Sequence, residues 1–431
     1  QFASRIGMLL SVIGVAVGLG NVWRFPYMMG SYGGSAFLLV YLLFTLLLAV
    51  PVLSAEWALG RSTAMGIPGA YLASFGKRFG WLVAGLLLIT VLVADSYYLL
   101  VIAQILMTAG WAIMPGFSAD NLGQFQGWLG NGWLQYTLAI LLLGLSLWII
   151  GRGLNRGIEA CSRFIMPGFA LVMLYLIAVA LALPGAMSAL RTFLRPDFSA
   201  MSATDVFAAL GQAFFSLGLG GTFHVVYGSY VRREQSLPLA AVTTAVGDVS
   251  AALLAALFIV PVALVFSLDL AQGPGLIFAT LPRLFMHLPD GGMLGAVFLL
   301  ALAAVALLSN IAALEVAAAA ARERWPGFSS RHAVRILLAL FVIEAVLMLP
   351  SALDNRLIGI LDLVFGSGMQ LLGGLLAVLA LVWGLQRSTA ASALFGQHAA
   401  RWHSWYLHWL RWIIPLVICS VFAGWLLQQF T

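Results

Sequence analysis

The chain is dominated by apolar runs that are long enough to cross a lipid bilayer as helices. A membrane helix needs about twenty consecutive apolar residues. We expect eleven such helices, near residues 4–31, 35–60, 80–112, 133–151, 157–184, 203–232, 238–268, 291–323, 331–349, 356–386 and 410–429. Hydrophobic residues make up 62% of the chain and charged residues only 8%, whereas soluble domains carry about a quarter charged residues. The sequence therefore predicts an all-α polytopic membrane protein with eleven transmembrane helices.

The basic residues lie at the ends of the apolar runs rather than in one patch. The net charge is +6, but this scatter fits membrane topology better than nucleic-acid binding, so we expect a lipid bilayer and no nucleic acid as partner. Cytoplasmic loops are enriched in Lys and Arg. If the N-terminus is cytoplasmic, most basic residues lie inside, Arg24 lies within the first helix, and the exterior keeps Arg191, Arg195, Arg283 and Arg356. The odd helix number then places the C-terminus outside.

The first apolar run contains a stretch that a membrane helix should not tolerate. Residues 14–26 hold three glycines, an Asn and an Arg within thirteen positions. Glycine weakens a helix, and Asn21 and Arg24 are costly in hydrocarbon unless they have partners. Non-helical backbone at membrane depth is tolerated only where it is buried in protein or lines a cavity. We therefore expect the first helix to be broken at a binding site.

A second interruption occurs in the sixth apolar run. Residues 214–222 again hold three glycines together with Ser216 and Thr222. Paired interruptions in corresponding positions indicate a transporter built from two inverted repeats, with its site at the membrane midplane. We expect repeats over residues 1–184 and 203–386, and an interfacial connection plus the last helix over 387–431. The alternative is a pair of glycine-rich packing faces.

Broken helices also suit ions and amino acids. One half-helix end exposes N–H groups, which bind a carboxylate, and the other exposes carbonyl groups, which bind a cation. Ser216, Thr222 and Asn21 supply further neutral oxygens. An amino acid carboxylate beside a monovalent cation would complete the ion's shell and link the binding of the two.

Several motifs resemble the bacterial neurotransmitter:sodium symporters. The resemblance rests on residues 14–26, 33–37 and 56–61, and on 212–217 with Ser229 and Tyr230, and it covers essentially the whole chain. It implies a sodium-coupled amino acid symporter that works by alternating access, in the eleven-helix form of that family. Gly18 stands where the monoamine branch has an Asp, which implies that the substrate supplies its own carboxylate.

The resemblance also implies a set of site residues. The first sodium ion would be held by the carbonyl of Ala16 and the side chains of Asn21, Ser216 and Asp248. The outer gate would be formed by Arg24 and Asp362 with Gln212 in support, and the inner gate by Arg5 with Glu323. The substrate would be bound by Ala16, Gly18, Gly20, Ala94, Tyr98, Phe215, Ser216, Gly218, Gly221, Ser309 and Ala313.

One sodium site departs from the family pattern. The resemblance places a second ion among the carbonyls of Gly14, Val17 and Val305 and two hydroxyl groups of the eighth helix, of which only Ser309 is present. Leu308 stands where a Thr or Asp is usual, and Leu cannot bind a cation. A lost ligand should cost on the order of a few kcal/mol. Either a water or Asn310 substitutes, which leaves a weakened site, or the site is lost.

Five carboxylates raise further questions. Asp248 occupies a position where many relatives have Asn, and Ala252 follows one turn later, so we expect no need for chloride. A proton could neutralise Asp248 on the return step, or helix-end donors could satisfy it permanently. Asp95 lies in the middle of the third helix; it could bind a cationic side chain, relay a proton or bond to a neighbouring helix. Glu344, Glu56 and Glu315 raise the same question. For Glu56 and Glu315 the stronger interpretation is that they bond one helix to another.

The expected cavity is large. Gly218, Gly221, Ala94 and Ala313 leave room for a bulky hydrophobic or aromatic amino acid, although small side chains also serve helix packing. No facing nucleophile and base indicate an enzyme. The expectation is a chloride-independent sodium symporter in a bacterial inner membrane, with proton antiport through Asp248 left open. The alternatives are a cationic-amino-acid or proton-coupled transporter with a degenerate second sodium site, or an amino acid sensor on a transporter fold.

Overall fold

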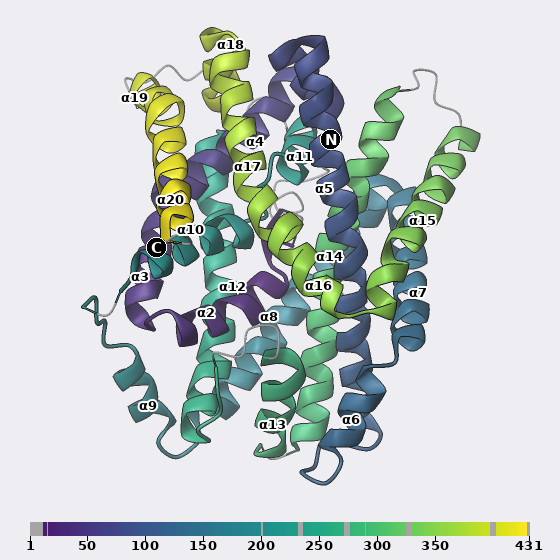
Figure 1. The fold of residues 1–431 in the computed structure, drawn as a ribbon, viewed down its shortest axis with the longest axis vertical. Helices are drawn as coiled ribbons and strands as arrows, with labels where there is room; N and C mark the ends of the chain where they lie inside the picture. Colours follow the sequence, from purple (N-terminus) through teal and green to yellow (C-terminus); the bar gives the residue numbers. More distant parts are fainter. Residues whose placement is uncertain are drawn as a thin grey trace.

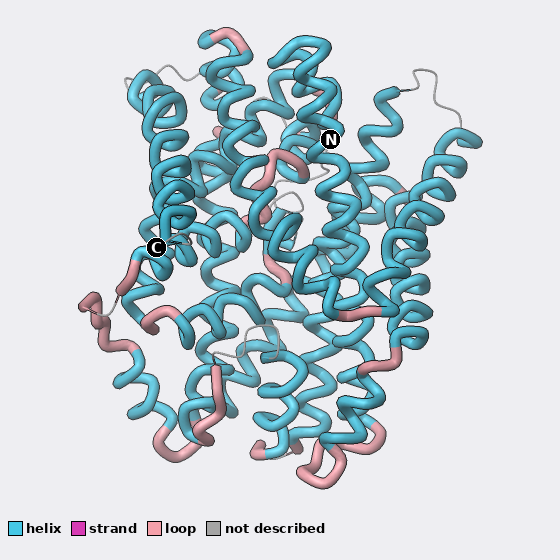
Figure 2. Tube along the Cα trace, in the orientation of Figure 1, coloured by secondary structure: helices cyan, strands magenta, loops and turns pink. Residues whose placement is uncertain are grey.

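The computed structural model describes residues 12–14, 16–199, 201–231, 236–270, 276–288, 290–324, 330–396 and 402–428. Within these ranges the chain consists of helices joined by loops and turns and contains no strand (Figure 2). Nine helices of the described residues are long and apolar enough to cross a membrane. The all-α membrane class is therefore confirmed. The first and sixth expected helices are not among the nine, because each is interrupted.

The helices follow the apolar runs of the sequence. Their bounds are α2 Phe25–Ser31, α3 Ser35–Phe44, α4 Val50–Thr63, α5 Ile67–Ile113, α6 Leu122–Leu129, α7 Gly132–Gly151, α8 Ala160–Leu181, α9 Ala186–Phe193, α10 Ala203–Ser216, α11 Phe223–Tyr230, α12 Leu237–Val265, α13 Leu281–Met286, α14 Gly291–Arg324, α15 Ser330–Leu353, α16 Arg356–Leu361, α17 Met369–Leu379, α18 Arg387–Phe395, α19 Trp402–His408 and α20 Ile414–Gln428. Short π-helical turns continue several of them, as between α3 and α4 and between α16 and α17.

The third expected helix begins earlier than the apolar run. Helix α5 starts at Ile67 rather than near residue 80, and its path changes at Gly76, where φ is +77°. Only glycine adopts that conformation readily, so the residues before Gly76 form a separate short helix that the kink joins to the long one. The basic pair Lys77 and Arg78 follows directly.

The helices are arranged as a bundle with enclosed and peripheral members (Figure 1). Helices α18 and α19 lie at one end of the bundle, and the short helices α6, α9 and α13 lie at the other (Figure 1). In the most apolar 18-residue stretch of α5, α12 and α14, the buried share is 61%, 61% and 72%. In the segment that contains α20, the corresponding share is 22%. Helices that are apolar all round are typical of membrane proteins, and outward side chains such as Phe164 then face lipid.

Candidate functional site

The first helix is interrupted at Val17 and Gly18. Residues 12–14 and Ala16 are helical, Val17 and Gly18 form a bend, and a π-helical turn over Gly20–Arg24 leads into α2. The Asn21 side chain folds back, so that its Oδ1 accepts from the Gly18 N–H at 3.1 Å. Gln212 of α10 donates to the Gly20 carbonyl at 3.1 Å. Asn21, a residue of the break itself, thus bonds to one of the backbone groups that the break leaves without a helical partner.

The second interruption separates α10 from α11. Helix α10 ends at Ser216 and α11 begins at Phe223, and Gly218 and Gly221 have φ of +65° and +69°. Glu56 of α4 accepts from the N–H groups of Gly220 and Gly221 at 3.0 and 2.9 Å. These bonds confirm the expectation that Glu56 ties helices together.

Two further side chains hold the carbonyl groups of the same segment. The Tyr71 hydroxyl donates to the Gly221 carbonyl at 3.0 Å, and His224 Nε2 lies 2.7 Å from the Leu217 carbonyl. Trp57 Nε1 donates to His224 Nδ1 at 3.1 Å, which fixes Nε2 as the nitrogen that carries the proton. Helix α5 and the second half of the broken helix, which Trp57 of α4 orients, therefore hold the carbonyl groups of the second break.

Three polar side chains from different segments meet beside the first break. Asn21 Nδ2 lies 2.6 Å from Asp248 Oδ1 and 3.1 Å from Ser216 Oγ, and Ser216 Oγ donates to Asp248 Oδ2 at 2.7 Å. All three side chains are at most 1% exposed. We call Asn21, Ser216 and Asp248 the polar cluster. The carboxylate and the hydroxyl group supply hard oxygen atoms in a dry setting, which suit the sodium ion that the sequence predicts, whereas the Asn21 amide turns its nitrogen toward them and its oxygen toward the Gly18 N–H.

A cavity of about 110 Å³ touches both breaks. Of the eleven expected substrate-binding residues, all but Ser216 and Gly221 line it: Ala16, Gly18, Gly20, Ala94, Tyr98, Phe215, Gly218, Ser309 and Ala313. Ser216 belongs to the polar cluster. Gly221 lies in close packing instead, because a Cβ atom there would be 2.3 Å from the Tyr71 hydroxyl. The absence of a side chain at Gly221 therefore serves packing of the second break.

Gly18 is the point of closest approach in the cavity. A Cβ atom at this position would lie 3.0 Å from Ser309 Oγ and 3.1 Å from the Tyr98 hydroxyl. The Tyr98 hydroxyl also interacts with Ser309 and with the backbone of Leu19. The hydroxyl groups of α5 and α14 thus converge on the backbone of the first break, which is the arrangement that a substrate carboxylate requires.

The second ion position is surrounded differently. Leu308 of α14 is 3% exposed and points at the first helix, since a Cβ atom on Gly14 would lie 3.0 Å from its Cδ1 atom. The side chain of Met166 lies next nearest, at 3.6 Å. Asn310 does not turn toward this place, because its amide is bonded to Asp95 and Ser146. Apolar atoms therefore stand where a further oxygen ligand would be needed.

The expected outer gate residues lie on one side of the cavity. The Arg24 guanidinium lies 4.2 Å from the centre of the Phe215 ring, a cation–π contact. Asp362 lines the cavity, accepts from the Tyr97 hydroxyl at 3.2 Å and is close enough to Arg24 to interact with its charge. Arg24, Phe215 and Asp362 therefore meet as a group at this side.

Of the two expected inner-gate residues, Glu323 lies within the described residues. Arg5 lies outside the described residues. Glu323 accepts from the N–H groups of Gly66 and Gly69 at 3.0 and 3.2 Å, so it caps the start of α5.

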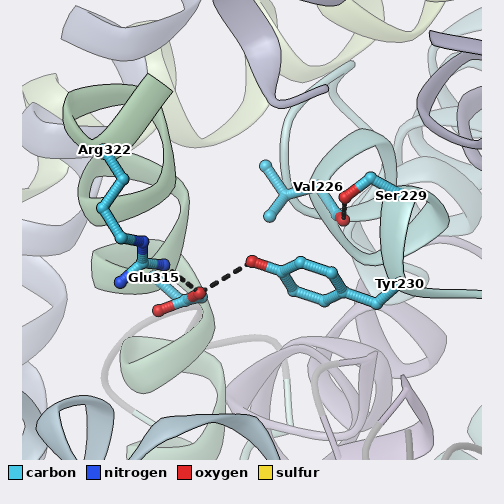
Figure 3. Close-up of polar contacts among 5 residues, drawn as sticks. All are labelled: Val226, Ser229, Tyr230, Glu315 and Arg322. Carbon is cyan, nitrogen blue, oxygen red and sulfur yellow. Dashed lines mark hydrogen bonds and ion pairs between the residues drawn. The ribbon is translucent and has the colours of Figure 1, made fainter. Parts of the chain in front are cut away.

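A separate contact at this end joins α11 to α14. The Tyr230 hydroxyl donates to Glu315 at 2.8 Å, and Arg322 forms an ion pair with the same carboxylate (Figure 3). Ser229 bonds locally to the Val226 carbonyl (Figure 3). Glu315 thus ties the second half of the broken helix to α14, as expected for it.

Asp95 bonds to a neighbouring helix. Both of its oxygens accept from Asn310 Nδ2, at 2.8 and 2.9 Å, and Ser146 of α7 donates to Asn310 Oδ1. Asp95 also lines the cavity. Of the three roles considered for this carboxylate, helix bonding is therefore visible in the structure.

Sequence reasoning missed several residues that line the cavity. Val91, Tyr97, Phe223, Gly366 and Gln370 all contribute to its wall. Tyr97 and Val91 lie on the same helix as Tyr98 and Asp95, so helical spacing could have indicated them. Gly366 and Gln370 follow Asp362 by about one and two turns, which is the same signal. Phe223 is the first residue of α11, and only the exact end of the break identifies it.

Comparison with known proteins gives a consistent result. The family model described as the sodium:neurotransmitter symporter family matches residues 1–111 and 117–429. An uncharacterized sodium-dependent transporter of Bacillus subtilis, YhdH, is 30% identical over 98% of this chain and 97% of its own. A similar transporter of Methanocaldococcus jannaschii, MJ1319, is 30% identical over 89% and 81% of the two chains.

A solved structure is also similar over nearly its whole length. The crystal structure of MhsT in complex with L-phenylalanine matches with a TM-score of 0.87 and 32% sequence identity, covering 98% of this chain and 99% of that one. The bundle with two interrupted helices is therefore the fold of that protein.

Proposed function

Because the chain belongs to the sodium:neurotransmitter symporter family, which consists of transporters and not enzymes, we propose that it is a sodium-coupled symporter for a bulky hydrophobic or aromatic amino acid. The observation that carries the proposal is one cavity that touches both helix breaks, with the polar cluster beside it. A carboxylate bound at Gly18 and Tyr98 would lie near a cation held by the polar cluster. Each ligand would then strengthen the binding of the other.

The cavity wall supports an apolar substrate side chain. Val91, Ala94, Phe215, Phe223 and Ala313 supply carbon surface. Asp95 and Asp362 are the acidic residues that line the cavity, but Asn310 already donates to both oxygens of Asp95, and Asp362 accepts from Tyr97 and interacts with the charge of Arg24. The similar protein MhsT was crystallised with L-phenylalanine. These points favour an aromatic or large aliphatic amino acid over a cationic one.

The ion requirements follow from the same residues. The polar cluster contains its own carboxylate, Asp248, so the charge that chloride would supply is already part of the site, and transport is chloride-independent. The ion held there involves the Ala16 carbonyl and the side chains of Asn21, Ser216 and Asp248. The position beside Gly14 and Val17 faces Leu308 and does not hold sodium strongly. A proton on Asp248 during the return step would make the carrier a proton antiporter.

Transport by alternating access requires a gate that closes over the bound substrate. Arg24, Phe215 and Asp362 close the outer side over the substrate, with Gln212 holding the first break through the Gly20 carbonyl. The protein spans a bacterial inner membrane with a cytoplasmic N-terminus and an external C-terminus. In that orientation α18 and α19 lie at the cytoplasmic end of the bundle (Figure 1).

The test is a thermal-shift screen of the common amino acids with sodium, potassium and lithium. We expect phenylalanine-like or leucine-like amino acids to raise the melting temperature in sodium and not in potassium, because a ligand stabilises the state that it binds. If no amino acid stabilises the protein with any ion, the proposal is wrong. Counterflow of the binding amino acid in liposomes then separates a transporter, which exchanges it, from a sensor, which does not.

A further inference from the structure

Glu344 is a buried carboxyl group that the proposed transport site does not use. It lies within α15, and its side chain is 0% exposed. Neither of its carboxyl oxygens has a hydrogen-bond partner among the described residues. Burying an ionised carboxylate without a partner costs several kcal/mol. A chain that keeps a carboxyl group in this place must therefore hold it neutral or supply a cation.

The charged group that acts on Glu344 is another acid. Asp95 of α5 is 3% exposed and lies close enough to Glu344 for the two to repel each other when both are ionised. Asn310 of α14 donates to both Asp95 oxygens, and Ser146 of α7 donates to Asn310. Four helices thus enclose two carboxyl groups, of which one has donors and the other has none.

The surrounding helices supply no cation to this pair among the described residues. No described basic side chain acts on either carboxyl group. Tyr98 follows Asp95 by one turn and bonds to Ser309, and the Tyr136 hydroxyl of α7 is bonded to the Ala345 carbonyl.

The other charged residues of the helices around this pair lie at helix ends or bond to other residues. They are Lys77 and Arg78 on α5, Glu315, Arg322 and Glu323 on α14, His332 and Arg335 on α15, and Arg356 with Asp362 near α16. Glu315 is paired with Arg322, Glu323 caps α5, and Asp362 bonds to Tyr97. Among the described side chains, the two carboxyl groups therefore interact electrostatically with each other and not with any cation.

The oxygen count argues against a metal ion between the two acids. The hard cations Ca²⁺ and Mg²⁺ take about six oxygen ligands. Asn310 presents its N–H groups to Asp95, and its oxygen already accepts from Ser146. No group of three or more His, Cys, Asp or Glu residues that could hold a metal occurs among the described residues. Two carboxyl groups that are close enough to repel each other, with no cation beside them among the described residues, do not both ionise.

We propose that Glu344 and Asp95 form a proton-binding site in which Glu344 carries the proton and Asp95 remains a carboxylate held by Asn310. Asp95 also lines the cavity, so the charge of the proton-binding site acts on the cavity. Loss of the proton would place a second negative charge behind the wall near Tyr98, where the substrate carboxylate is expected. The affinity for the amino acid then falls as the pH rises and the proton leaves. This consequence rests on the proposed function; the proton site itself does not.

Infrared spectroscopy of the full chain tests the proton site directly. A neutral carboxyl group has a C=O stretching band that an ionised one lacks. We expect the difference spectrum between the wild type and Glu344→Gln at neutral pH to show the loss of one such band. Glu159→Gln is the matched control, because Glu159 is a buried acid that pairs with Arg163 and should contribute no such band. An unchanged neutral-carboxyl region in Glu344→Gln would overturn the proposal.

A second variant provides the test if Glu344→Gln fails to fold. Glu344→Met replaces a neutral, unbonded side chain by an apolar one of similar length, and it should fold and lose the same band. If Glu344→Met retains the full neutral-carboxyl band of the wild type, the proton does not reside on Glu344, and the proposal is wrong.

Substrate binding tests the consequence for the cavity. With L-phenylalanine as the probe in saturating sodium, we expect the wild-type affinity to fall on the alkaline side by up to about tenfold per pH unit, the limit for one linked proton. Glu344→Gln should keep its affinity and lose this dependence. The same alkaline fall in Glu344→Gln would contradict the link to the cavity. If L-phenylalanine binds neither protein, the substrate proposal fails, and the infrared result still decides the proton site.

Discussion

The two ion positions expected around the first break differ in the side chains that other helices bring to them. At the polar cluster, Ser216 of α10 and Asp248 of α12 meet Asn21, and all three are buried and hydrogen-bonded. At the other position, α14 brings Leu308, whose methyl group lies beside Gly14. On the proposed function, the same interruption of a helix would therefore serve a cation on one side and not on the other. Exposed carbonyl groups alone do not make an ion site; the facing helix must add oxygens.

The difference has an energetic reason. A sodium ion taken out of water must recover its hydration from protein oxygens, and each missing ligand costs on the order of a few kcal/mol. Asp248 also supplies a full negative charge in a dry setting, where its attraction for a cation is weakly screened. Most of the sodium dependence should therefore come from the polar cluster.

Replacing the charge of the polar cluster should have the largest effect. Asp248→Asn keeps the size of the side chain but removes the negative charge, so sodium affinity should fall by about a hundredfold or more, equivalent to about 3 kcal/mol for a buried charged partner. The measurement is a sodium titration of the thermal stability. Asp120→Asn, at an exposed position between α5 and α6, is the control and should change nothing. An unaltered sodium midpoint in Asp248→Asn would rule out the polar cluster as the sodium site.

Adding one methyl group at Gly18, between the two ion positions, should lower the affinity for the amino acid more than the affinity for sodium. In Gly18→Ala the new Cβ atom would crowd Ser309 Oγ and the Tyr98 hydroxyl at 3.0 and 3.1 Å. Overpacking of this kind costs about 1–3 kcal/mol, so amino acid affinity should fall by about tenfold or more.

Isothermal calorimetry measures this change, and Gly144→Ala is the control. Gly144 lies on α7, and a Cβ atom added there would meet no other atom within 4 Å, so its substitution should be silent. Equal losses in the two variants would show that the effect is a general one on helix stability rather than one on the cavity.

Supplying the missing oxygen should strengthen the second position by a smaller amount. Leu308→Thr places a hydroxyl group where the methyl groups of Leu308 lie, and we expect sodium affinity to rise several-fold, or about 1 kcal/mol, which is the net worth of one polar contact. Leu308→Val is the matched control, because Val has the shape of Thr without the oxygen. A rise of the same size in both variants would mean that the removed volume, not the oxygen, matters.

Removing chloride should have the smallest effect. Exchange of chloride for gluconate should change sodium-dependent amino acid binding by less than about twofold, because Asp248 already supplies a charge that is weakly screened in its dry surroundings. The measurement is the amino acid affinity in the two salts at equal ionic strength. A clear loss of affinity without chloride would show that the carboxylate does not replace the anion.

Much of this organisation was readable from the chain. The apolar runs predicted the helices, and the glycines at 14–20 and 216–222 predicted where two of them break, because both signals are local. The start of α5 at Ile67 was missed, since the polar residues around Gly76 hid a short helix that packs within the protein rather than across the membrane. Whether eleven spans and two inverted repeats describe the chain stays a prediction.

The site was predicted where a motif fixed the residue and missed where packing chose the partner. Asn21, Ser216 and Asp248 were expected together and lie together. The support of the second break by Tyr71 and His224 could not be anticipated, because it depends on which side chains adjacent helices bring into reach. The bonding of Asp95 to Asn310 and its closeness to Glu344 have the same origin, because α5 had to be placed against the pair α14 and α15, which follows it by almost 180 residues.

A sodium titration of amino acid binding in the wild type tests the contrast between the two positions most directly. We expect a Hill coefficient of about one, because in the proposed function the polar cluster holds a sodium ion and the other position lacks an oxygen ligand. The coefficient can approach two only if two sodium ions bind cooperatively. A Hill coefficient clearly near two would contradict the contrast.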